Sequence, residues 1–208
     1  MKRIAESTVR RLSLYLGFLE RRDGDGNATI SSDELAHLGG TTSAQVRKDL
    51  SLFGSFGKRG LGYSVSELSR HLREILGLEK EWNVCIIGAG KIGAALARYP
   101  GFAERGFIVT AVYDRDPSKV GKRWENLVIR DVADLERDAV REHFDIAVLA
   151  TPAESAPDTV RRIVSAGIKA ILNFAPVQLN VPAEVTVRAV NMAIELEGLS
   201  FALSNRER

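Results

Sequence analysis

The chain has 208 residues, which is enough for one large domain or two small ones. Its 45% apolar content excludes a disordered chain, and its one cysteine excludes an internal disulfide and a cysteine metal cluster. The net charge of +2 identifies no class of partner, and no apolar stretch reaches the ~18 residues that a membrane span requires. Because the N-terminal segment MKRIAESTVRRL also lacks the apolar core of a signal peptide, we expect a cytoplasmic protein without a membrane partner.

The N-terminal part of the sequence predicts a small helical domain. Apolar residues recur at helical spacing from residue 5, which predicts a first helix that ends near Arg22. A second helix is expected over 32–38, between a serine cap and two glycines, and a third over 43–53. The segment GSFGKRGLGY is too rich in glycine for a helix and predicts two short strands around a tight turn. This order of elements, with a further helix over 66–76, predicts a winged helix-turn-helix domain over residues 1–78.

From residue 83 the pattern alternates between strands and helices. Such alternation is typical of an α/β fold with a doubly wound parallel sheet, and we assign this Rossmann domain to residues 79–190. An amphipathic helix over 192–203 has no strand after it, so residues 191–208 are set apart as a C-terminal segment. The expected strands are 83–88, 107–114, 126–130, 145–150, 168–174 and 185–190, and the expected helices are 91–99, 131–142 and 155–166.

The segment IIGAGKIGAALA predicts a dinucleotide-binding loop. Its three glycines have the spacing G-x-G-x-x-G directly after a strand and at the start of a helix. The first glycine permits a tight turn, the second lets a pyrophosphate approach the backbone, and the third lets the helix pack closely on the strand. The free N–H groups at the start of the helix would then face the phosphates. We therefore expect the cofactor to contact Gly88, Ala89, Gly90, Lys91, Ile92 and Gly93.

Further cofactor contacts are expected where the parallel strands end. Asp114 ends the second strand and could accept hydrogen bonds from the adenosine ribose, which favours NAD(H) over NADP(H), although Arg115 beside it could help to hold NADP. Coenzyme A in the same crevice, or a glycine turn without any ligand, are the alternatives. Residues after the fourth and fifth expected strands could border the nicotinamide: Thr151, Pro152, Asn173, Phe174, Ala175 and Pro176.

The sequence offers no catalytic residue and no metal site. His37 and His71 lie in the helical N-terminal region, and His143 precedes a strand at the edge expected to face away from the cofactor. Cys85, in VCIIG, is interpreted as a buried core residue rather than a redox thiol. Because a dehydrogenase needs an acid or base beside the nicotinamide, a nucleotide sensor is favoured over an enzyme.

Four cations and a single carboxylate lie between residues 43 and 63, and they predict a DNA-binding surface. The third helix would place its first half in the major groove of double-stranded DNA, with contacts from Ser43, Gln45, Arg47 and Lys48. The hairpin tip would reach the adjacent minor groove with Lys58, Arg59 and Gly60. The alternative is a solvated basic face on a small helical domain.

The segments QVRKDLSLFGSFGKRGLGY, IIGAGKIG, YPGF and ILNFAPV closely resemble the Rex family of redox-sensing transcriptional repressors. The resemblance covers nearly the whole chain. It implies a homodimer that binds NAD(H) and exchanges its last helix between subunits, so residues 191–208 are assigned to a C-terminal dimerisation helix. A basic winged helix joined to a dinucleotide loop without a catalytic acid then predicts a repressor that binds a two-fold symmetric operator and is released from it by NADH. By the same resemblance, Tyr99, Asn191 and Phe201 are expected at the dimer and switch region.

The chain departs from the family pattern at two places that could affect redox discrimination. Members commonly have Asp-Phe where this chain has Asn191 and Met192, and often an arginine where it has Gly17. Loss of both members of an ion pair leaves no charge without a partner, but it bears on how strongly the protein discriminates between NADH and NAD⁺. A DNA-binding regulator with coenzyme A or redox-insensitive NAD specificity therefore stays open. So does a small NAD(P)-dependent oxidoreductase whose N-terminal segment serves for dimerisation.

Overall fold

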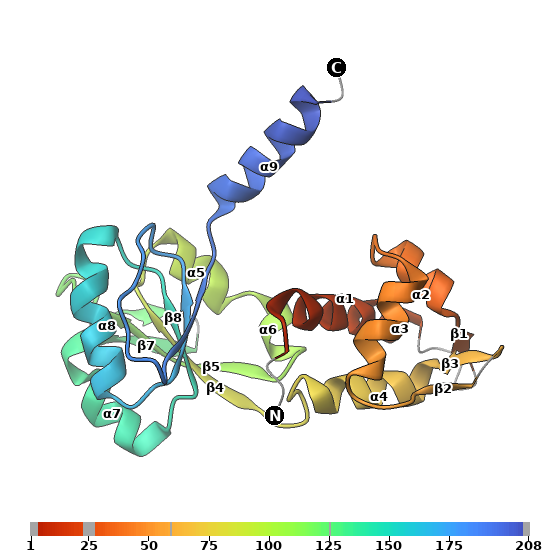
Figure 1. Ribbon diagram of the computed structural model, residues 1–208. Helices are drawn as coiled ribbons and strands as arrows, with labels where there is room; N and C mark the ends of the chain where they lie inside the picture. The colour runs from red at the N-terminus through yellow and green to blue at the C-terminus, as the bar shows by residue number, and fades with distance from the viewer. Residues whose placement is uncertain (1–3, 23–27, 59, 125, 206–208) are drawn as a thin grey trace. The chain divides into compact units, whose positions relative to one another are not determined.

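The computed structural model describes residues 4–22, 28–58, 60–124 and 126–205 (Figure 1). The chain divides into two compact units, Met1–Lys80 and Glu81–Arg208. Among the described residues, no helix is both long and apolar enough to cross a membrane.

The first unit combines four helices with a small antiparallel sheet. Serine and threonine side chains begin three of the helices: Ser31 caps α2 in a capping box with Glu34, Thr42 caps α3, and Ser64 caps α4. The strands lie in the order β1-β3-β2, so the two strands of the predicted hairpin pair with each other, and β3 also pairs with an unpredicted strand, β1. In chain order the elements are α1 (Glu6–Arg22), β1 (Thr29–Ile30), α2 (Ser32–Leu38), α3 (Ser43–Ser51), β2 (Gly57–Lys58), β3 (Gly62–Ser64) and α4 (Val65–Ile75).

One face of α1 forms much of the core of this unit. Leu12, Leu16 and Leu19 are fully buried, as their helical spacing predicts, and Tyr15 is buried between them. Val9, which the same pattern placed on the buried face, is 38% exposed, and the neighbouring Thr8 is buried instead.

The second unit contains a seven-stranded sheet in the order β10-β9-β8-β4-β5-β7-β6. All pairs are parallel except β6 with β7, so the predicted doubly wound parallel sheet gains an antiparallel edge strand that the sequence pattern did not indicate. The strands are β4 (Trp82–Ile87), β5 (Phe107–Asp114), β6 (Arg123–Trp124), β7 (Leu127–Asp131), β8 (Ile146–Leu149), β9 (Ala170–Asn173) and β10 (Thr186–Ala189). The helices are α5 (Lys91–Ala97), α6 (Pro100–Ala103), η1 (Val132–Asp134), α7 (Leu135–Glu142), η2 (Ala153–Ser155), α8 (Ala156–Ser165) and α9 (Met192–Ser204).

The helix predicted over 91–99 ends two residues early. Tyr99 has an extended backbone because it precedes Pro100, and the proline begins the separate short helix α6.

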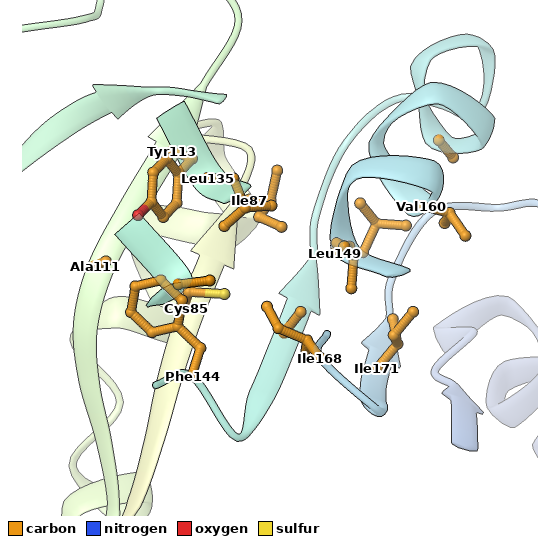
Figure 2. Close-up of a cluster of buried hydrophobic side chains, with 14 of the residues drawn as sticks. Cys85, Ile87, Ala111, Tyr113, Leu135, Phe144, Leu149, Val160, Ile168 and Ile171 are labelled. Carbon is orange, nitrogen blue, oxygen red and sulfur yellow. The ribbon is translucent and has the colours of Figure 1, made fainter. Parts of the chain in front are cut away.

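Alternate residues of the central strands pack on opposite faces of the sheet. Cys85 and Ile87 of β4 join Tyr113, Leu149 and Ile171 in a core that α7 and α8 cover (Figure 2). The other face holds Val84 and Ile86, and Leu96 and Ala97 of α5 pack against their cluster. Figure 1 shows α5 on the side of the sheet opposite to α7 and α8. Cys85 is fully buried, so its interpretation as a core residue is confirmed.

The C-terminal helix α9 is apolar on two opposite sides. Met192, Leu196, Leu199 and Leu203 follow one another at spacings of four, three and four, which places them along one side. Ile194 and Phe201 lie seven residues apart on the opposite side, and all six are exposed within this chain. The helix expected over 192–203 is present, but its apolar side chains lie on two opposite sides and not on one, as the prediction of an amphipathic helix requires.

Candidate functional site

The glycine-rich turn between β4 and α5 has the geometry that a phosphate-binding loop requires. Gly88 has a φ of +110°, and a Cβ there would collide with the backbone of Ala150. A Cβ at Gly93 would collide with the carbonyl oxygen of Gly88, so this glycine allows α5 to pack against the turn. A Cβ at Gly90 would meet nothing within 4 Å, because this residue borders an open cavity. Two of the glycines therefore serve the fold, and the third leaves room for a ligand.

Asp114, at the end of β5, holds this turn in shape. Its carboxylate accepts hydrogen bonds from the backbone N–H of Ala89 at 2.8 Å and of Asp116 at 2.9 Å, and from Lys119 Nζ at 3.0 Å. Burial acts to raise the pKa of Asp114, but the hydrogen bonds from Asp116, Lys119 and Ala89 outweigh it and hold the pKa below its ordinary value. The side chain predicted to bind a ribose is thus a charged acceptor that also fixes the loop.

A cavity of about 1000 Å³ lies over the turn and the carboxyl ends of the strands. This is the place where open α/β sheets bind their ligands. Of the predicted cofactor residues, those that line the cavity are Gly88, Gly90, Lys91, Ile92, Asp114, Thr151 and Pro152, together with Phe174 and Pro176. The cavity lining does not include Ala89, Gly93, Asn173 or Ala175.

Asn173 supports the loop after β9 instead of facing the cavity. Its side chain is 2% exposed; Oδ1 accepts a hydrogen bond from the Ala175 N–H at 2.9 Å, and Nδ2 donates one to the Val177 carbonyl at 3.0 Å. Ala175 is buried in the core that α7 and α8 cover. These bonds fix the loop that carries Phe174 and Pro176, so Asn173 acts on the cavity through its neighbours.

The residues that line the cavity fit a dinucleotide. The Oγ1 atom of Thr151 is buried without a hydrogen-bond partner, so it is available to a ligand in the cavity that this residue lines. Sequence reasoning missed Lys119, Val132, Ser155 and Thr159, which also line the cavity. Lys119 and Val132 lie in the connections after β5 and β7, and Ser155 and Thr159 lie in η2 and α8 after β8. Their place beyond the carboxyl ends of parallel strands is a signal that could have found them.

Cys85 is not placed to react as a thiol. Burial raises the pKa of Cys85 to about 12, so the thiol stays protonated at neutral pH and out of reach of oxidants. Among the described residues, no three His, Cys, Asp or Glu side chains are grouped to hold a metal ion.

The predicted DNA-contacting residues of α3 face two separate hollows. Arg47 is exposed, donates a hydrogen bond to Ser32 Oγ at 2.9 Å, and lines a hollow of about 650 Å³ together with Gly60 of the hairpin. Gln45 and the exposed Lys48 line a second hollow of about 430 Å³ beside α1. The structure therefore brings Arg47 to the hairpin but turns Gln45 towards α1.

The remaining predicted DNA contacts lie at the helix start and at the hairpin. Ser43 is the half-exposed first residue of α3. Lys58 belongs to β2 and is paired with Gly62 of β3, and Gly60 has a φ of +84°. Arg59 lies outside the described residues.

The predicted dimer and switch residues are accessible within the single chain. Tyr99 is 56% exposed, its ring meets Phe102 edge-on at 5.3 Å, and it lines a cavity of about 460 Å³ whose walls include Ile146 and Leu172. Asn191 caps α9, since its Oδ1 accepts a hydrogen bond from the Ala193 N–H at 3.0 Å. Phe201 is 72% exposed.

Comparisons with known proteins agree with the two-part organisation. Residues 3–51 match the family described as "Putative DNA-binding protein N-terminus", and residues 79–177 match "CoA binding domain". These matches, the helical first unit and the parallel sheet with its glycine turn define a class: a helical DNA-binding region joined to a Rossmann-like nucleotide-binding domain.

Full-length relatives identify the family within this class. The redox-sensing transcriptional repressor Rex of Desulfitobacterium hafniense is 46% identical over 98% of this chain and 97% of its own length. Rex of Thermus thermophilus is 47% identical over 98% of this chain and 95% of its own length. The chain belongs to the Rex family of redox-sensing transcriptional repressors. Its relatives are thus named as repressors and not as enzymes.

Two solved structures similar to the whole chain are described with a dinucleotide, and one of them also with operator DNA. The repressor RSP, described in complex with β-NAD⁺ and operator DNA, covers all of this chain and 95% of its own at a TM-score of 0.91 and 38% identity. RSP in complex with β-NADH covers all of this chain and 97% of its own at a TM-score of 0.90 and 37% identity.

Proposed function

We propose that this chain is a homodimeric repressor that binds a two-fold symmetric operator and is released from it by NADH. The observation that carries the proposal is the pairing, in one chain, of an open glycine turn with a helix, α3, on which Arg47 and Lys48 are exposed. The relatives support it, because RSP is described with operator DNA, with NAD⁺ and with NADH.

Within this proposal the chain has three parts. Residues 1–78 form a winged helix-turn-helix with α3 as recognition helix and β2–β3 as wing, residues 79–190 form the NAD(H)-binding domain, and residues 191–208 form the dimerisation helix. The order of elements in the first unit and the antiparallel pairing of β2 with β3 support the first assignment. The exposure of the apolar side chains of α9 supports the last one.

The residues of the cavity would bind and orient the dinucleotide. The N–H groups at the start of α5 would face the pyrophosphate, Asp114 would accept from a ribose, and Thr151 Oγ1 and Phe174 would lie beside the nicotinamide. The bound dinucleotide supplies a ring whose charge differs between its two oxidation states. A hundredfold preference of NADH for the shape that does not bind DNA would shift the equilibrium by about 2.7 kcal/mol.

Titration of NADH, NAD⁺ and coenzyme A into a complex with a selected palindromic duplex tests the function. We expect NADH to dissociate the complex and NAD⁺ to compete with it at the same site. A DNA affinity that stays constant at saturating NADH would refute the redox switch. The match to a CoA-binding family supports a second candidate, a regulator that responds to coenzyme A. Release of the DNA by coenzyme A alone would favour this candidate.

The hairpin contact predicts an electrostatic effect on DNA affinity. Arg59→Ala should weaken DNA binding and lower the slope of log K against log salt by about 0.9 for each phosphate that the protein no longer neutralises. The matched control is Arg161→Ala, which removes an equal charge from an exposed helical position in the second unit. If DNA binding by both variants depends on salt concentration with the same slope as in the wild type, Arg59 does not contact the duplex.

The C-terminal helix predicts the oligomeric state. A helix that exposes apolar side chains on two opposite sides needs a partner on each, and a second copy of the chain would supply them. Leu196→Glu should therefore yield monomers in analytical ultracentrifugation at concentrations where the wild type sediments as a dimer. Glu197→Gln, a change at a neighbouring exposed position, should leave the dimer intact.

A further inference from the structure

A buried carboxylate joins the recognition helix to α1. Asp49 of α3 is 1% exposed, and its side chain points to the face of the helix that packs inside the first unit. The guanidinium of Arg11 in α1 donates two hydrogen bonds to it, from Nε to Oδ2 at 2.6 Å and from Nη2 to Oδ1 at 2.7 Å. The Tyr15 hydroxyl donates a third hydrogen bond, to Oδ2 at 3.2 Å. This cluster fixes the carboxylate in both position and orientation.

Asp49 in turn holds a side chain that the sequence assigns to DNA. Gln45 Nε2 donates a hydrogen bond to Asp49 Oδ1 at 2.8 Å, one helical turn away. Burial acts to raise the pKa of Asp49, but the hydrogen bonds from Arg11 and Gln45 outweigh it and keep the pKa below its ordinary value. At neutral pH the carboxylate can therefore only accept hydrogen bonds, and the group that faces it must be the amide NH₂ of Gln45.

The amide oxygen of Gln45 is consequently directed away from Asp49. Within the described part of the chain, no residue donates a hydrogen bond to Oε1, and this atom is not among the buried atoms without a partner. Gln45 is only half-buried, and it lies one residue before Val46, the first buried side chain of α3. A free acceptor with a fixed direction is thus present on the helix that is proposed to enter the major groove.

We propose that Asp49 is a positioning residue that directs Gln45 Oε1 to accept a hydrogen bond from a base amino group in the operator. In the major groove this group is the 6-amino group of adenine or the 4-amino group of cytosine, while guanine and thymine present acceptors there. Phosphate oxygens offer no donor to Oε1, so the contact would carry sequence information. The inference rests on the proposed function, in which α3 reads the operator.

Base analogues that lack the amino group test the contact directly. The duplex is a palindrome selected with the wild-type protein, in which adenines are replaced one at a time by purine and cytosines by 2-pyrimidinone. At one position in each half-site, we expect deletion of the amino group to weaken wild-type binding by about 5-fold or more. The variant Gln45→Met, which keeps the length of the side chain, should respond to the same deletion by less than about 2-fold.

Two further variants separate positioning from structural support. Asp49→Asn offers Gln45 an amide that can donate or accept, so the orientation of Gln45 is no longer fixed, and the loss caused by the amino deletion should fall towards that of Gln45→Met. Tyr15→Phe is the matched control, because it removes a hydrogen bond from Oδ2 but leaves the bond between Gln45 and Oδ1. This variant should keep the full response to the analogue even where its overall stability is lower.

The outcomes are distinguishable from one another. Equal responses of wild type and Gln45→Met at every position would overturn the contact, and an unchanged response in Asp49→Asn would overturn the positioning role. If Asp49→Asn does not fold, as judged by circular dichroism, the double variant Arg11→Gln with Asp49→Asn removes both charges together and takes its place. Absence of any sequence-selective binding would refute the proposed function itself, whereas selective binding without this coupling refutes only the present inference.

Discussion

Gly90→Val should weaken NADH binding by about 100-fold or more, equivalent to about 2.7 kcal/mol, without unfolding the protein. A Cβ added at Gly90 meets no atom within 4 Å, and a side chain there would project into the space that a pyrophosphate needs. Isothermal titration calorimetry measures the affinity. In a DNA-binding assay, this variant should keep its operator affinity and no longer respond to NADH.

The neighbouring glycine supplies the control for this prediction. Gly88→Val should lower the melting temperature strongly, because its Cβ would collide with the backbone of Ala150 and its φ of +110° disfavours any side chain. The contrast separates a residue that leaves room for a ligand from one that shapes the turn. If Gly90→Val binds NADH as the wild type does, the glycine turn does not hold the dinucleotide.

Arg11→Ala should destabilise the first unit by about 3 kcal/mol, because it leaves a buried carboxylate without its charge partner. Asp49 is 1% exposed whereas the Arg11 side chain is 23% exposed, so water reaches one member of the pair and the lower end of the expected range applies. Chemical denaturation of the wild type and the variant measures the difference. Arg22→Ala, which breaks the exposed ion pair with Glu34, should have little effect.

The loss of stability caused by Arg11→Ala should also depend on pH. In the wild type the folded-state pKa of Asp49 lies below its ordinary value, so its contribution is present above the unfolded-state pKa and is lost as the pH falls through the folded-state pKa. Without Arg11, burial acts with less opposition and the pKa of Asp49 should rise. The stability of Arg11→Ala relative to the wild type should therefore improve on acidification, and a difference that is constant with pH would contradict the account.

Local signals in the sequence identified most elements of the fold. The cap at Ser31 and the glycine after Leu38 gave the bounds of α2, and the strand-turn-helix context of the glycine loop located the cavity. These features depend on interactions within a few residues, which a sequence pattern records. The Rex family resemblance is confirmed by relatives that match along the whole chain.

The features that the sequence did not reveal depend on distant contacts. In the sequence Asp49 is one acid among cations, and its burial arises from Arg11 and Tyr15, which lie more than 30 residues away in the chain. Asn173 ends β9 at the carboxyl-terminal edge of the sheet, where cofactor contacts are expected. Its side chain nevertheless forms hydrogen bonds with the loop that follows the strand. The edge strand β6 is two residues long, which is too short for a periodic pattern to indicate.

The bonds of Asp114 also bear on how quickly the protein can respond. Because two backbone N–H groups and Lys119 hold this carboxylate, the turn at Ala89 keeps its conformation through bonds within the chain. Exchange of one oxidation state of the dinucleotide for the other would therefore require no refolding of the loop. The speed of the response would then depend on exchange of the nucleotide and on the change of shape that releases DNA, and not on ordering of this loop.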